Sequence, residues 1–131
     1  MTSSFLSIAL RGAAVALAVS VAMPAAAEVS FKGKSVTVIV GSTPGGSTDA
    51  SARLLQRFFG KHLPGKPDVI VSNRPGAKGL KAQNFFAQQV KGDGRTMLVA
   101  SGSQIDPTNY RVKQSKYDPT TYTLVGGLDI G

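Results

Sequence analysis

Hydrophobic and polar positions follow two kinds of pattern along the middle of the chain. Three short runs, residues 36–40, 68–72 and 96–100, are rich in apolar and β-branched residues, as is typical of buried strands. Two longer segments between them, 48–59 and 80–90, carry apolar residues at helical spacing. The resulting β-α-β-α-β order predicts an α/β fold, in which helices cover both faces of a parallel sheet.

The two helices have specific expected features. Ser47 or Thr48 can cap the first helix, because a hydroxyl accepts from a free N–H of the first turn, and Asp49 suits the positive end of the helix dipole. The expected apolar face of this helix consists of Ala50, Leu54, Leu55, Phe58 and Phe59. The expected apolar face of the second helix consists of Ala82, Phe86 and Val90. Residues 106–119 show no clear period, and residues 122–128 could form a fourth strand.

The first 27 residues have the three parts of a secretory signal peptide. Arg11 is their only charge, an apolar stretch covers residues 13–23, and Pro24 is followed by three alanines. The apolar stretch is shorter than the roughly 20 residues that a spanning helix needs. We therefore expect cleavage after Ala27 and export to the periplasm. A membrane anchor or an interfacial helix is the alternative.

Charge and residue content narrow the class of partner. The chain has 15 Lys and Arg against 7 Asp and Glu, a net charge of +8, which suits an anionic partner. The basic residues are spread out and an exported protein rarely meets nucleic acid, so no nucleic-acid partner is expected. A solvated surface is the alternative explanation of the charge. With no cysteine and one histidine, thiolate catalysis is excluded and a zinc site has too few ligands, so no metal is expected.

Three loops that follow the predicted strands are rich in glycine and serine. They are residues 41–48, 73–79 and 101–103. Ligands of open α/β sheets bind at the carboxyl ends of the strands, and the first loop leads into a helix N-terminus, which favours anions. These loops predict a site for a carboxylate or a phosphate. A loop that only makes the turn is the alternative.

Nucleotide motifs do not fit the first loop. Gly41 and Gly46 have the spacing of a P-loop, and Thr48 sits where the hydroxyl of that motif would be. However, Ser47 stands in the place of the lysine that holds the phosphates. A G-x-G-x-x-G motif is also absent after this strand, so no nucleotide or dinucleotide cofactor is expected.

Other polar residues of the loops have more than one interpretation. Asp49 could accept from an amine or hydroxyl of a solute, or from backbone N–H groups at the helix start. Arg74 could pair with an anion, and Asn73 is expected to organise its loop by side-chain-to-backbone bonds. An exported hydrolase-like enzyme is the rival function. Such an enzyme would need the only histidine, His62, within about 3 Å of a loop serine such as Ser47 or Ser101. Our expectation is that the chain is not an enzyme.

Four stretches together carry a family resemblance. They are VIVGSTPGGSTDASARLL (38–55), VIVSNRPGAKG (69–79), GRTML (94–98) and YDP (117–119). Behind a signal peptide and in this order, they resemble the receptor subunit of tripartite tricarboxylate transporters, the Bug family of periplasmic solute-binding proteins. The resemblance covers nearly all of residues 31–128.

The resemblance implies a two-domain α/β receptor that closes on its ligand like a flytrap. Such a receptor captures a small carboxylate and delivers it to the membrane subunits of the transporter. In the family, N–H groups of the first loop and groups at neighbouring strand ends hold the carboxylate. By position, this implies a binding site made of Thr43, Pro44, Gly45, Gly46, Ser47, Thr48, Asp49, Ser101 and Gly102.

The chain departs from the family pattern in two ways. Many relatives have a P-x-P-A-G-G loop where residues 42–47 read STPGGS, and the extra hydroxyls leave the identity of the solute open. A full receptor would also be more than twice as long. We therefore expect residues 28–131 to be the N-terminal part of solute-binding domain I, with the second domain missing. A non-functional fragment is a further alternative, and it would show no cooperative unfolding.

Overall fold

The computed structural model describes residues 29–127 of the chain, so the predicted signal peptide and its cleavage site lie outside the described residues. The main elements are β1 (Ser35–Val40), α1 (Ser47–His62), β2 (Asp68–Asn73), α2 (Leu80–Gln89) and β3 (Thr96–Val99). Their order is the predicted β-α-β-α-β. Within the described part, no helix combines the length and the apolar character needed to cross a membrane.

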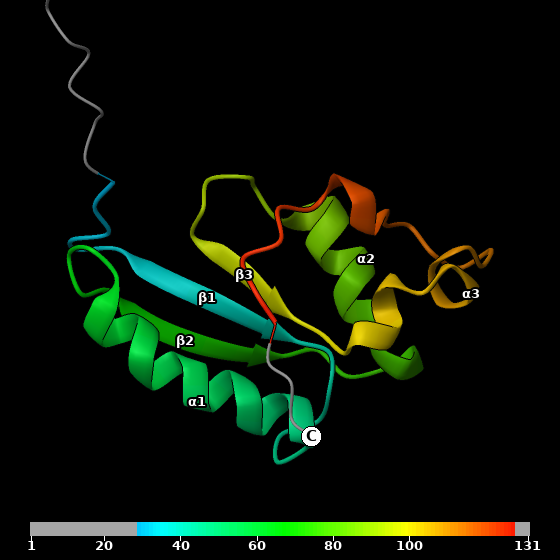
Figure 1. Ribbon diagram of the computed structural model, residues 1–131, viewed down its shortest axis with the longest axis horizontal. Helices are drawn as coiled ribbons and strands as arrows, with labels where there is room; N and C mark the ends of the chain where they lie inside the picture. The colour runs from blue at the N-terminus through cyan, green and yellow to red at the C-terminus, as the bar shows by residue number, and fades with distance from the viewer. Residues whose placement is uncertain (1–28, 128–131) are drawn as a thin grey trace, which may run out of the picture.

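The three strands form one parallel sheet in the order β2-β1-β3, with β1 in the middle (Figure 1). Val38 of β1 lies opposite Val71 of β2 on one side and opposite Met97 of β3 on the other. Because β-branched residues favour the extended conformation, the valines of β1 suit a central strand. All three strands point the same way, so their carboxyl ends meet at one edge of the sheet.

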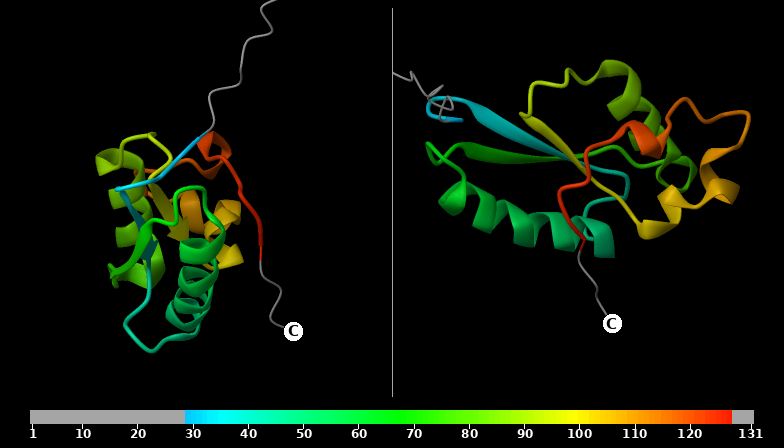
Figure 2. Two further views of the ribbon diagram at one scale, coloured as in Figure 1. Left: turned by 90° about the vertical axis from the view of Figure 1, so that its left-hand side faces the viewer. Right: turned by 45° about the horizontal axis from the view of Figure 1, so that its top comes forward.

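Helices cover both faces of the sheet (Figure 2). Alternate residues of β1 show this directly, because successive side chains of a strand point to opposite faces. Val36, Val38 and Val40 form a buried cluster with Ala52 of α1. Ile39 is only 2 % exposed and faces the side of α2. The predicted α/β fold is therefore confirmed.

The inward stripe of α1 contains polar as well as apolar residues. Asp49 and Ala52 are buried, and Phe59 packs against the cluster of valines. One turn before Phe59, the side-chain amide of Gln56 donates to the backbone oxygen of Val69 at 2.6 Å. The helix is thus fastened to β2 by a hydrogen bond as well as by apolar packing.

The predicted apolar face of α1 is wrong in part. Ala50 is exposed, and Leu54 and Phe58 are each 53 % exposed. The error arises because hydrogen-bonded polar residues occupy part of the inward stripe. A face chosen from the apolar residues alone is therefore turned about the helix axis relative to the face that is buried. The predicted cap is also wrong: Gly46 is the N-cap residue, and no side chain caps the helix.

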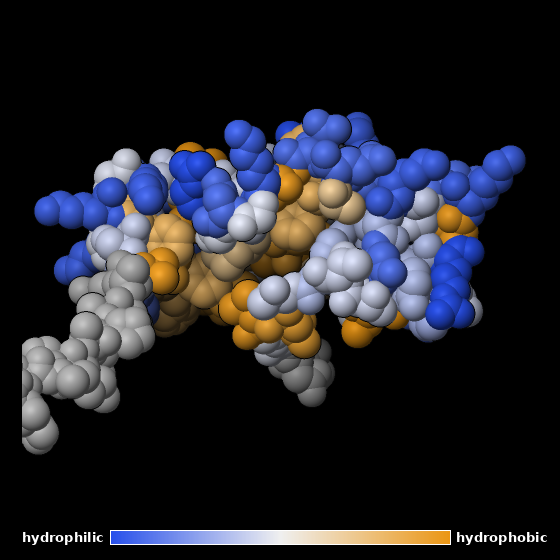
Figure 3. Space-filling view, turned by 90° about the horizontal axis from the view of Figure 1, so that it is seen from above, coloured by the Kyte–Doolittle hydropathy of each residue, from blue (hydrophilic) through white to orange (hydrophobic). Residues whose placement is uncertain are grey.

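The segment after β3 differs from the prediction. Residues 106–119 were expected to be irregular but contain the short helix α3 (Pro107–Tyr110), and a 3-10 helix lies on either side of it (Gly102–Ile105 and Pro119–Thr121). Residues 122–127 form no strand, because no neighbouring strand pairs with them in the described part. Leu124 and Val125 are 87 % and 79 % exposed. Figure 3 shows hydrophobic residues gathered in the middle of one face, with hydrophilic residues along much of its rim.

Candidate functional site

A hollow of about 340 Å³ lies at the carboxyl ends of the strands. The chain passes from β1 to β2 on one side and then returns to β3 on the other, so the connections diverge at this edge. Such a divergence is where open α/β sheets bind their ligands. The polar residues that line the hollow include Ser42, Thr43, Thr48, Lys78, Gln83 and Ser101.

Glycines allow the first two loops to meet beside the hollow. A Cβ atom at Gly41 would lie 3.0 Å from the Cα atom of Gly79, which is backbone and cannot swing aside. Gly79 itself has a φ of +90°, in the left-handed region that favours glycine. The close approach of the two loops therefore depends on the absence of side chains at these positions.

We expect Gly41→Ala to lower the free energy of unfolding by about 1–2 kcal/mol, because the added methyl group forces the two loops apart. Urea denaturation measures the change. Gly92→Ala is the matched control, since nothing lies within 4 Å of a Cβ atom there. Equal effects of the two substitutions would show that the loops have room to separate.

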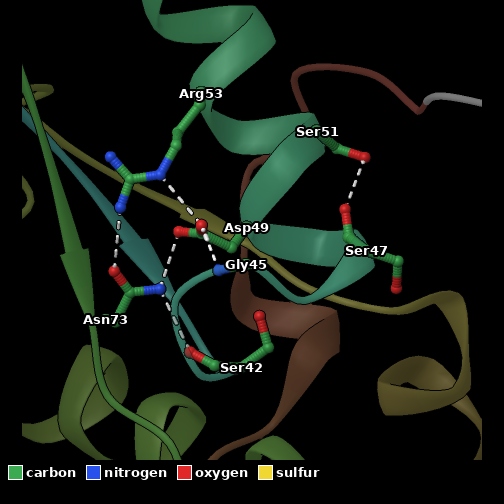
Figure 4. Close-up of polar contacts among 7 residues, drawn as sticks. All are labelled: Ser42, Gly45, Ser47, Asp49, Ser51, Arg53 and Asn73. Carbon is green, nitrogen blue, oxygen red and sulfur yellow. Dashed lines mark hydrogen bonds and ion pairs between the residues drawn. The ribbon is translucent and has the colours of Figure 1, made fainter.

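The carboxylate of Asp49 holds the first loop in place (Figure 4). One oxygen accepts from the N–H of Gly45 at 2.9 Å and from Nε of Arg53 at 2.8 Å. The other accepts from Nδ2 of Asn73 at 2.8 Å, and the same amide donates to the backbone oxygen of Ser42 at 3.1 Å. These bonds, above all the one from Arg53, hold the pKa of Asp49 well below its usual range.

Two residues that the sequence analysis singled out, Asn73 and Asp49, belong to this hydrogen-bonded cluster. Asn73 was expected to organise its own loop, 73–79, but its side-chain amide instead donates to a backbone oxygen of the first loop. Asp49 is 1 % exposed and receives three hydrogen bonds from the protein. Its carboxylate lies beneath the loop and does not line the hollow. The geometry gives Asp49 a positioning role.

The N-terminus of α1 has free donors. The N–H groups of Gly45 and Gly46 are used within the loop, by Asp49 and by the backbone oxygen of Thr43. By contrast, the N–H groups of Ser47, Thr48 and Asp49 have no acceptor among residues 29–127. The positive end of the helix dipole adds to the effect of these donors. Thr48 connects this helix end to the hollow, because it also lines it.

The charges around the hollow favour an anion. Lys78 lines it, and no aspartate or glutamate does so within the described part of the chain. Lys78 has a φ of 54°, so its backbone is left-handed and turns the chain sharply at the rim. A cation and a helix N-terminus at one hollow make it suitable for a carboxylate or a phosphate.

The nine predicted site residues have different places in the structure. Thr43, Thr48 and Ser101 line the hollow. Pro44, Gly45, Gly46 and Ser47 form the adjoining loop and helix start, Asp49 lies below it, and Gly102 begins the following 3-10 helix. The nine predicted residues do not include Ser42, Lys78, Gln83 or Gln104, although Ser42 and Lys78 lie in two of the loops predicted to form the site. For Gln83, the available signal was its place in the sequence, directly after Ala82 of the expected inward face of α2.

A second hollow, of about 400 Å³, lies on the α2 side of the sheet. Ile39, Phe85 and Arg74 line it, and the guanidinium of Arg74 lies 3.4 Å from the centre of the Phe85 ring. This hollow runs along the strands and does not lie at their carboxyl ends, so it lacks the helix N-terminus of the other. Although Arg74 belongs to loop 73–79, it lines this second hollow and does not line the one at the carboxyl ends of the strands.

The serine–histidine pair of the rival enzyme does not form at Ser47. Ser47 and His62 are the first and last residues of the 16-residue α1. A rise of about 1.5 Å per residue puts them roughly 22 Å apart. His62 instead stacks on Phe58, with ring centres 6.5 Å apart.

Fold and site together define an α/β domain with an anion-favouring hollow at the carboxyl ends of a parallel sheet. No family model matches the chain. It is, however, 38 % identical over 96 residues to Protein BugT of Bordetella pertussis, which covers 73 % of this chain and 28 % of that protein. It is 37 % identical over 106 residues to a UPF0065 protein of Bordetella bronchiseptica, covering 81 % and 30 %. A UPF0065 protein of Cupriavidus necator is 41 % identical over 91 residues, covering 69 % and 26 %.

The chain therefore belongs to the Bug, or UPF0065, family, as its loops predict. It spans less than a third of the length of these relatives.

Proposed function

We propose that this chain is part of a periplasmic solute-binding receptor that captures a small carboxylate for a tripartite tricarboxylate transporter. The observation that carries the proposal is the uncapped N-terminus of α1 beside the hollow at the strand ends. Membership of the Bug family and the net charge of +8 support it. The proposed function contains no catalysed step, because binding alone selects the solute.

The carboxylate would lie against the first turn of α1. The N–H groups of Ser47, Thr48 and Asp49 supply donors, and the ammonium group of Lys78 supplies the opposite charge. Hydrogen bonds to an ionised group are each worth about 1.5–3 kcal/mol, so two or three of them are enough to orient a small solute. A volume of about 340 Å³ is within the range of small-molecule sites.

The wider parts of the proposal concern the rest of the receptor. We propose that the predicted signal peptide delivers the chain to the periplasm. We also propose that residues 28–131 form the first part of domain I and that the remainder of the receptor supplies the other wall of the cleft. Closure of the two walls on the solute would present the receptor to the membrane subunits.

Calorimetric titration of the full chain with succinate, malate and citrate tests the proposal. We expect saturable binding of at least one of these acids, and Ser47→Pro should weaken it by about tenfold. Proline lacks the N–H but is favoured at the first position of a helix. Gly46 before it already has an extended backbone, with ψ of 164°.

Ser51→Ala is the control for this titration. The Ser51 hydroxyl donates to the backbone oxygen of Ser47 at 3.1 Å and does not line the hollow (Figure 4). Its removal should leave the affinity unchanged. The proposal fails if none of the three acids binds, and the assigned helix end is wrong if Ser47→Pro binds as well as the unmodified chain.

A further inference from the structure

Two buried glutamines line the same hollow and differ in the hydrogen bonds of their side-chain amides. Gln104 is 9 % exposed, and protein groups surround its amide: Nε2 donates to the backbone oxygen of Lys78 at 2.8 Å, and Oε1 lies 3.4 Å from the hydroxyl of Tyr117, which donates to the backbone oxygen of Gln104 at 2.9 Å. Gln83 is 4 % exposed, yet its Oε1 has no partner among residues 29–127. Buried amide oxygens normally have partners, because an unpaired one is costly.

With the amide oriented as in the structure, the missing partner of Gln83 Oε1 is a hydrogen-bond donor. An amide oxygen only accepts, and an ionised carboxylate has no hydrogen to give. The carboxylate proposed at α1 therefore leaves Oε1 of Gln83 unsatisfied, and another group of the solute is needed for this atom. Ser42 Oγ is also buried at this hollow without a partner in the described residues. Ser42 Oγ is thus a second polar atom of this hollow that lacks a partner within residues 29–127.

The charges at the hollow favour a hydroxyl over an ammonium group. Lys78 and the N-terminus of α1 are both positive, and no carboxylate of the described chain lines the hollow. Asp49 is not available to neutralise an ammonium group, since it is buried beneath the loop with three donors of its own. A neutral hydroxyl needs no such counter-charge.

We propose that the solute is a hydroxycarboxylate, with Gln83 as the residue that recognises its hydroxyl group. This inference rests on the proposed carboxylate site and specifies the class of solute. A solute without the hydroxyl leaves Oε1 of Gln83 unpaired. Sites built around a hydrogen bond reject such analogues strongly.

Titration with malate and succinate, which differ by one hydroxyl group, tests the inference. The unmodified full chain should bind malate at least about tenfold more tightly than succinate. Gln83→Met, which keeps the length of the side chain but removes the amide, should abolish this preference by weakening malate binding while succinate binding is unchanged. Gln88→Met on the exposed side of α2 is the matched control and should keep the preference. Circular dichroism checks that each variant is folded.

The outcomes separate the inference from the proposed function. Equal affinities for malate and succinate, or a preference that survives in Gln83→Met, would overturn the hydroxyl assignment and leave the carboxylate site standing. Tighter binding of aspartate than of malate would also overturn it, in favour of an amine. If malate, succinate, citrate and aspartate all fail to bind, the carboxylate site itself fails, and the inference fails with it.

Discussion

Replacement of Asp49 by alanine should lower the thermal midpoint of unfolding by on the order of 10 °C. The substitution takes away the shared acceptor of the Gly45 N–H, Arg53 and Asn73. Donors that lose their partner inside a protein are costly, so the first loop should also detach from β2. Circular dichroism during heating measures the midpoint. Asp68→Ala is the control, because Asp68 is exposed at the start of β2, and its midpoint should fall by less than about 2 °C.

Measuring the thermal midpoint at decreasing pH isolates the contribution of the Asp49 charge to stability. Its pKa is lowered in the folded chain, so its contribution to stability is present above the ordinary carboxyl pKa of about 4 and is lost as the pH falls toward the native pKa. The unmodified chain should therefore lose stability progressively below about pH 5, and Asp49→Asn should lose less over that interval. Parallel declines of the two midpoints with pH would contradict the assigned role of the charge. Absence of any cooperative transition would favour the non-functional fragment.

The strands could be predicted closely because their signal is local. The run at residues 36–40 became β1 (Ser35–Val40), and the run at 96–100 became β3 (Thr96–Val99). In both, consecutive β-branched or apolar residues fit a buried parallel strand without help from distant residues. The order of the elements then fixes the class of fold, since parallel strands need crossover helices between them.

The buried face of α1 depends on tertiary contacts that the pattern does not contain. Asp49 is buried where Asn73, 24 residues away, donates to it, and Gln56 is half-buried where the backbone oxygen of Val69 accepts from it. Read by hydropathy, both would be assigned to the solvent side. The exposed Leu54 and Phe58 then take their place in the predicted core.

The site was predictable in outline and not in composition. Glycine-rich loops after parallel strands mark the edge of the sheet, which is why Thr43, Thr48 and Ser101 fall at the hollow. Gln83 comes from a helix and Lys78 from a left-handed turn with φ of 54°. Which of their atoms face the hollow follows from the packing of α2 against the sheet, and no motif encodes that packing.

The second large effect on stability is expected from one of two isoleucines that lie on the same face of the sheet. Ile39 of β1 and Ile70 of β2 both point to the α2 side, since Ile70 lies opposite Thr37 and Thr37 is two residues from Ile39. Ile39 is 2 % exposed and Ile70 is 51 % exposed. Ile39→Ala should therefore lower the free energy of unfolding by about 2–4 kcal/mol, and Ile70→Ala by less than about 1 kcal/mol. Urea denaturation of the full chain measures both.

The difference between the two isoleucines shows how much of the sheet α2 covers. The cost of removing a buried side chain comes from lost apolar burial and from the cavity that remains, and neither applies to a side chain already half in water. A small loss at Ile70 would mean that the β2 half of this face is open in the folded chain. A loss as large as that at Ile39 would mean that something covers Ile70, and the exposed half of the sheet would then be an interface.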